Sequence, residues 1–126
     1  MNCKSMQLYT NEISVKNHNL PGQNFTLSPK IMRRSGTLDG NRAFTEVRVE
    51  IHNTEGNPFP MDIDASMTGF FEIEGAGEEE LREFLEVEAV GLILPHLRNL
   101  IASTTAAALV TPVMLPIYDV KKLFPR

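Results

Sequence analysis

FPMDIDASMTGFFEIE, the sequence of residues 59–74, carries a pattern that continues for sixteen positions. Its odd-numbered positions from Phe59 to Ile73 are apolar, apart from Gly69. Its even-numbered positions are polar or proline, apart from Phe70. A period of two predicts a long strand with one buried face and one wet face. Because glycine weakens a strand interior, Gly69 predicts a bend or bulge at that point.

Three further strands are expected upstream of this stretch. Residues 43–51 alternate in the same way, and the turn-rich residues 53–57 predict a hairpin loop between the two runs. Residues 6–16 alternate more weakly and predict a first strand, followed by a loop over residues 17–24. Residues 25–34 predict a second strand interrupted at Pro29, which suits an edge or a bulge. Strands joined by loops and not by helices favour an antiparallel sheet.

The second half of the chain changes to a helical period. Residues 78–88 predict a helix with acids in its first turn, and Gly91 predicts a break after it. A second helix is expected to begin near Leu92 and to reach residue 107 or 108. Residues 110–117 form an apolar loop, and Asp119 predicts the N-cap of one closing turn. The fold class is therefore α+β, with a four-stranded antiparallel sheet followed by helices in a single domain, residues 1–126.

Composition excludes several functional classes. The chain has 126 residues, a formal net charge of −4 and one cysteine, which fits a globular protein of a reducing compartment, the cytoplasm. Residues 61–88 hold ten acids and one arginine, and such a surface repels nucleic acid. Residues 99–118 are uncharged over the length of a membrane span, but Pro112 and Pro116 within them argue against insertion in a membrane.

No residue pattern points firmly to catalysis. The three histidines lack metal-ligand spacing, so neither a metal nor a cofactor is expected. Asp62 and Asp64 are two apart in a predicted strand, which places both carboxylates on one face. They are interpreted as part of a wet sheet face, and the alternative is an acid/base pair of a small hydrolase. We therefore expect a protein that is not an enzyme.

Several ordered motifs resemble the bacterial protein-export chaperone family SecB. They are FEIEG at residues 71–75, LPHLR at 94–98, IAS at 101–103, PVMLPIYDVKKLF at 112–124 and LYTNEIS at 8–14. Each motif is weak alone, whereas their order and spacing together are specific. The resemblance covers both ends and most of the chain.

The resemblance implies a four-stranded antiparallel sheet backed by a helical hairpin. It also implies a homo-oligomer, a dimer of dimers with helices sandwiched between sheets. It also implies that Glu12 and Asp64, and with them Asp62, contact the SecA motor ATPase, although Lys16 stands where members carry a third acid. The chain ends soon after residue 124, so the C-terminal helix of the family is expected to be truncated. The expected oligomer interface comprises Ile63, Ala65, Met67, Leu97, Ile101 and Thr104.

The function implied is that of an ATP-independent holdase, which binds unfolded preproteins or other non-native polypeptides for export through SecA. The alternatives are a SecB-like chaperone of a toxin-antitoxin system and a structural homo-oligomer without chaperone activity. We expect an apolar groove between the two proline-marked connections, because apolar contact accepts many sequences. Its expected lining is Leu20, Phe25, Leu27, Val113, Met114, Leu115, Ile117 and Tyr118.

Overall fold

Two strictly alternating strands form the centre of the sheet. In the computed structural model, which describes residues 1–22, 24–108 and 110–124, β3 (Arg42–Ile51) pairs antiparallel with β4 (Met61–Glu74). The odd-numbered side chains of both strands are buried, with Val47, Ile63 and Ala65 at 0% exposure. Burying an aliphatic side chain of this kind contributes about 1.5–3 kcal/mol, so the alternation of the sequence sets the inner face of the sheet.

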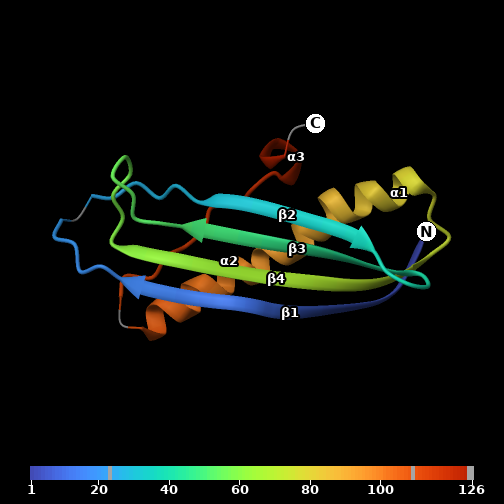
Figure 1. Ribbon diagram of the computed structural model, residues 1–126, viewed down its shortest axis with the longest axis horizontal. Coiled ribbons are helices and arrows are strands. Elements are labelled where there is room, and N and C mark those ends of the chain that lie inside the picture. Colours follow the sequence, from blue (N-terminus) through green and yellow to red (C-terminus); the bar gives the residue numbers. More distant parts are fainter. Residues whose placement is uncertain (23, 109, 125–126) are drawn as a thin grey trace.

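The remaining strands complete a sheet of order β1-β4-β3-β2. The edge strand β1 (Asn2–Asn17) begins earlier than expected, because its first residues pair with the far end of β4. At the other edge, β2 (Lys30–Thr37) starts directly after Pro29, which corrects the predicted strand over residues 25–34. The connection from β1 to β2 runs around one end of the sheet from edge to edge (Figure 1).

Gly69 does not mark a bulge, so that part of the prediction of a bend or bulge was wrong. Its neighbours pair in unbroken register with β1 and β3, whereas the two register shifts lie on β1, at Cys3/Ser5 and Thr10/Glu12. The glycine is required for packing, because a Cβ at this position would lie 2.9 Å from Cζ of Phe71. The ring of Phe71 lies across the space that a side chain would occupy.

The helical part is one continuous run of three segments: α1 (Glu78–Glu83), the π-helical η1 (Phe84–Glu88) and α2 (Ala89–Ala107). The predicted break at Gly91 was therefore wrong. A glycine inside a helix costs only about 1 kcal/mol, and the adjacent Ala89 and Val90 are wholly buried. A Cβ on Gly91 would lie 3.8 Å from Cγ2 of Val120, so the glycine also faces the C-terminal segment.

Side chains of the sheet satisfy carbonyl groups in the π-helical turn. Thr45 Oγ1 donates to the carbonyl of Leu85 at 2.8 Å, and Arg33 donates to the carbonyl of Glu86. The guanidinium of Arg33 also lies 4.3 Å from the centre of the Phe124 ring. Thus side chains of β2 and β3 hold the π-helical turn, and Arg33 of β2 also contacts Phe124.

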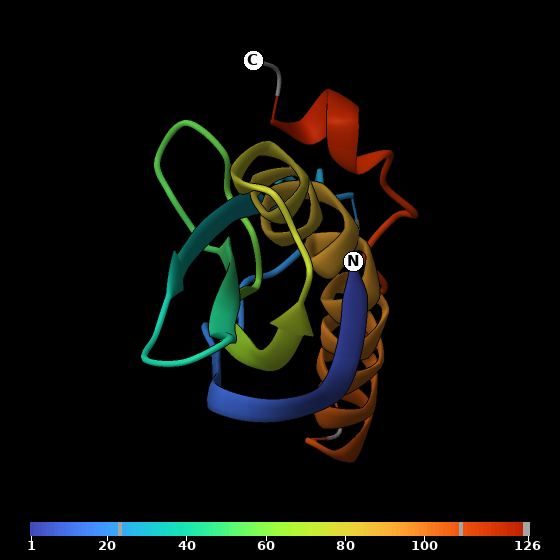
Figure 2. The same ribbon diagram turned by 90° about the vertical axis from the view of Figure 1, so that its right-hand side faces the viewer.

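The helices cover one face of the sheet, which curls around them in the end-on view of Figure 2. The second arm of the C-terminal helical hairpin is the short helix α3 (Val120–Leu123), and the Asp119 side chain caps it by accepting from the Lys121 N–H at 3.1 Å. The predicted cap and the predicted fold class are confirmed.

In the described ranges, none of the helices has the length and apolar character to cross a membrane. The main core lies between α2 and the sheet and includes Val49, Ile51, Ile63, Ile93, Leu97 and Ile101.

Candidate functional site

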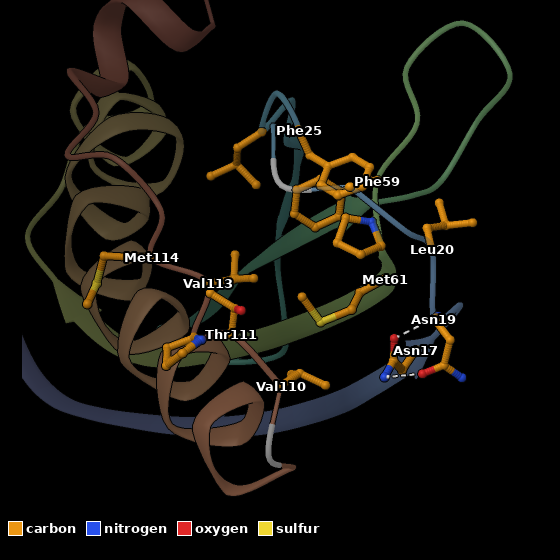
Figure 3. A pocket seen from close by; sticks show the side chains of 14 residues that line it. Asn17, Asn19, Leu20, Phe25, Phe59, Met61, Val110, Thr111, Val113 and Met114 are labelled. Atoms are coloured by element: carbon orange, nitrogen blue, oxygen red, sulfur yellow. Dashed lines mark hydrogen bonds between the residues drawn. The ribbon is translucent and has the colours of Figure 1, made fainter.

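A pocket of about 860 Å³, here called the crossover pocket, opens at the end of the sheet where three connections meet (Figure 3). Its walls come from the segment after β1, from the start of β4 and from the segment after α2. None of its lining residues within the described ranges is charged. The lining residues are Asn17, Asn19, Leu20, Gly22, Phe25, Leu27, Phe59, Pro60, Met61, Val110, Thr111, Pro112, Val113 and Met114.

Direct contacts hold the first two walls together. The His18 N–H donates to the Pro60 carbonyl at 2.8 Å, which ties the end of β1 to the start of β4. The rings of Phe25 and Phe59 meet edge to face, with centroids 6.3 Å apart. Phe59 is buried, whereas Phe25 is half-buried and lines the opening. These two contacts join the wall that follows β1 to the wall at the start of β4.

Hydrogen bonds from α2 hold the third wall. Thr105 Oγ1 accepts from the Val113 N–H at 3.0 Å while it donates to the Ile101 carbonyl at 2.7 Å. Further along, Arg98 Nε donates to the Leu115 carbonyl at 2.7 Å. These bonds pin a proline-containing segment that has no regular structure of its own.

The structure divides the predicted groove between two hollows. Five of the predicted residues line the crossover pocket, namely Leu20, Phe25, Leu27, Val113 and Met114. The other three, Leu115, Ile117 and Tyr118, line a second hollow of about 290 Å³ against the first half of α2, here called the helix pocket. Leu115 is 1% exposed and belongs to the core, whereas Ile117 is 89% exposed.

Some lining residues of the crossover pocket were not predicted from the sequence. Phe59 and Met61 begin the alternating stretch, and their apolar character was assigned to the sheet core. Asn17, Asn19 and Thr111 are polar and belong to connections, so nothing in their composition signals a pocket. Only the approach of the two connections in space brings these residues together.

The three predicted docking acids lie on the other side of the sheet, on its helix-free outer face. Arg48 on β3 lies among them, 2.6 Å from Glu12, 3.0 Å from Glu50 and 3.1 Å from Asp64. The hydrogen bonds that Arg48 donates to Glu12 and then to Glu50 raise the pKa of Arg48 above its ordinary value. One guanidinium thus pairs with three carboxylates of this face and offsets part of its negative charge inside the chain.

Two histidines bind the aspartates of the same face. His52 Nε2 lies 2.9 Å from Asp64 Oδ1, and His18 Nε2 lies 2.9 Å from Asp62 Oδ2. Asp62 also accepts the Asn53 N–H at 2.7 Å, and this hydrogen bond, followed by the effect of the adjacent His18 ring, lowers the pKa of its carboxyl. Asp62 and Asp64 share one face, as their spacing predicts, and each binds a separate histidine.

The His52–Asp64 contact predicts a pH-dependent stability. The hydrogen bond to Asp64 raises the pKa of His52 above 6.5. The contribution of this contact to the free energy of unfolding is therefore complete below pH 6.5. It disappears as the pH rises through the pKa of His52 in the folded protein. The free energy of unfolding of the wild type should exceed that of His52→Gln by more at pH 6 than at pH 9. The difference should stay below about 1 kcal/mol because the ring is 42% exposed. Urea unfolding at the two pH values measures it, and a pH-independent difference would contradict the assignment.

The residues expected at an oligomer interface lie mostly inside the single chain. Ile63, Ala65, Leu97 and Ile101 are at 0% exposure, so no surface of these side chains remains for a second copy. Met67, at 8% exposure, is also in this core. Thr104 is half-buried on α2, and its interface role stays a prediction.

Comparisons with known proteins agree with this architecture. A family model described as preprotein translocase subunit SecB matches residues 2–126. A SecB-like chaperone of Mycobacterium tuberculosis, solved with a ChAD peptide from the HigA1 antitoxin, is similar in fold with a TM-score of 0.74. The two chains are 14% identical, and the match covers 93% of this chain and 89% of that one.

An uncharacterized protein of Methanocaldococcus jannaschii is 35% identical over 57 residues. This match covers 45% of the present chain and 37% of the archaeal protein, so the chain spans well under two thirds of that relative.

Proposed function

This chain belongs to the SecB family, whose model it matches from residue 2 to residue 126, and we propose that it is an ATP-independent holdase for non-native polypeptides. The family is one of chaperones and not of enzymes. The observation that carries the proposal is the crossover pocket, an open hollow of about 860 Å³ whose described lining combines apolar side chains with uncharged polar groups. It is large enough for several side chains of an extended client.

The energetics of such a pocket suit a chaperone that releases its client without ATP. Covering apolar surface contributes about 25 cal/mol per Å², and ordering the client removes much of this gain. One site therefore binds a short segment weakly and with little sequence preference. Several sites in one assembly hold a long client together, because binding at the first site raises the effective concentration at the next.

Assembly as a dimer of dimers in the cytoplasm is part of the proposal. Two surfaces of the single chain support it. β1 is a sixteen-residue edge strand that pairs only with β4, and an edge of this length favours pairing with another strand. The outward side of α2 exposes Leu92 at 44%, together with His96 and Ser103, and no other element of the described chain covers it.

Two kinds of client remain. The family description supports preproteins for export, which requires docking on SecA. The antitoxin peptide held by the mycobacterial relative supports a toxin-antitoxin role. The second is favoured by the outer face, where Glu12, Asp62 and Asp64 each have a basic side chain of the same chain within 3.1 Å. Co-elution with purified SecA, followed by size-exclusion chromatography with light scattering, distinguishes the two roles, since only export needs that complex.

Replacing Leu20 by aspartate tests the pocket. Leu20 is half-buried in the lining, and a carboxylate placed there must lose water when an apolar segment binds. We expect affinity for a fluorescent apolar peptide to fall about tenfold or more, which corresponds to roughly 1.4 kcal/mol. Fluorescence anisotropy measures the affinity, and aggregation of a reduced, unfolded protein provides a second readout.

Leu38→Asp is the matched control. Leu38 is 40% exposed in the β2–β3 connection and does not line the crossover pocket. It should bind peptide like the wild type, since it adds the same charge away from the pocket. Equal affinity of both variants and the wild type would rule out client binding in the crossover pocket.

A further inference from the structure

The polar end of the crossover pocket contains two asparagines that hold each other. Asn17 Nδ2 donates to Asn19 Oδ1 at 3.1 Å, and the Asn19 N–H donates to Asn17 Oδ1 at 2.9 Å (Figure 3). Asn19 has a φ of 54°, in the left-handed region that few residues other than glycine adopt. The backbone of the loop thus fixes the carboxamide of Asn17 at the edge of the crossover pocket.

The pair leaves half of the hydrogen-bonding capacity of Asn17 unused. A primary carboxamide has two N–H donors and an oxygen with two lone pairs. One donor and one lone pair are engaged with Asn19, so one donor and one acceptor remain. A peptide unit likewise offers one N–H and one C=O.

The walls of the pocket present further backbone groups. Within the described part of the connection from β1 to β2, no backbone-to-backbone hydrogen bond involves residues 20–22 or 24–28. In the segment after α2, the N–H of Val113 is bound by Thr105, whereas no backbone-to-backbone bond joins Thr111 or Met114 to another described residue. Such groups need a partner, either water or a bound chain.

We propose that Asn17 recognises the main chain of the polypeptide in the crossover pocket, with Asn19 as its positioning residue. This inference rests on the proposed holdase function and names the chemistry of its client. The carboxamide accepts one peptide N–H and donates to one C=O of an extended segment, while the apolar lining contacts the side chains. Recognition of this kind depends on an extended backbone with free N–H groups and not on the order of the side chains.

The test compares two fluorescent peptides of the same uncharged apolar sequence, one of them methylated on every second backbone nitrogen. Methylation removes the N–H that Asn17 would bind. The wild type should bind the unmethylated peptide about fivefold to tenfold more tightly, the effect expected for one or two hydrogen bonds. Asn17→Leu, which keeps a similar volume, should bind the unmethylated peptide more weakly and lose most of this discrimination.

One further variant controls for damage to the loop, and another tests the positioning role of Asn19. Asn24→Leu changes an exposed residue of the same connection outside the pocket lining and should keep the preference of the wild type. Asn19→Gly keeps the left-handed backbone accessible but removes the side-chain carboxamide that accepts from Asn17. This variant should lose part of the discrimination between the two peptides.

The outcomes separate the two proposals. If Asn17→Leu binds both peptides as the wild type does, main-chain recognition by Asn17 is overturned and the holdase function stands. If the wild type binds neither peptide, the proposed function itself fails.

Discussion

Replacing Phe71 by alanine is expected to lower the free energy of unfolding by about 3–5 kcal/mol, the usual loss for a buried aromatic ring. Phe71 is 1% exposed, and its ring meets that of Phe84 edge to face with centroids 5.1 Å apart. It also covers Gly69, which has no side chain to fill the space left behind. The variant would therefore leave a cavity between β4 and the start of the helical run. Guanidinium unfolding followed by circular dichroism measures the loss.

The adjacent Phe70 provides the matched control. It lies on the outer face at 40% exposure and contacts the exposed ring of Tyr9 at a centroid distance of 5.8 Å. Phe70→Ala should cost about 1 kcal/mol or less, because most surface substitutions have small effects. If the two alanine variants were destabilised equally, the assignment of the two faces of β4 would be wrong.

Thr105→Val is expected to cost about 1–3 kcal/mol, the penalty for leaving a buried donor without a partner. Thr105 is wholly buried, and its hydroxyl joins the Ile101 carbonyl to the Val113 N–H. Valine has nearly the same shape but cannot accept that N–H. The segment after α2 would lose the contact that holds one wall of the crossover pocket, so peptide affinity should fall as well.

Thr105→Ser separates the hydroxyl from the packing. Serine retains the oxygen and should preserve most of the protection of the Val113 amide, which native-state hydrogen exchange measures directly. If the Val113 amide exchanges faster in Thr105→Val but not in Thr105→Ser, the result would support the hydroxyl as the link between α2 and this segment. Similar exchange in all three proteins would show that Thr105 does not hold the segment.

The predictable part of the candidate site was its apolar half. Leu20, Phe25 and Met114 were expected to line a groove because apolar residues in proline-marked connections have no strand or helix in which to be buried, and all three line the crossover pocket. The separation of Leu115 and Tyr118 into the helix pocket could not be predicted. It depends on the Arg98 hydrogen bond to Leu115, which joins residues 17 positions apart.

The alternation of residues 59–74 and 43–51 determined the strands, the inner face of the sheet and the fold class, because side chains in a strand point to opposite faces with a period of two. Motif order determined the family. Tertiary structure alone decided that Gly91 continues a helix, that Gly69 makes room for the ring of Phe71, and that Arg48 pairs with Glu12 and Asp64. The physical reason is that these outcomes depend on contacts between residues distant in sequence, whose free energies override local preference and which no local pattern encodes.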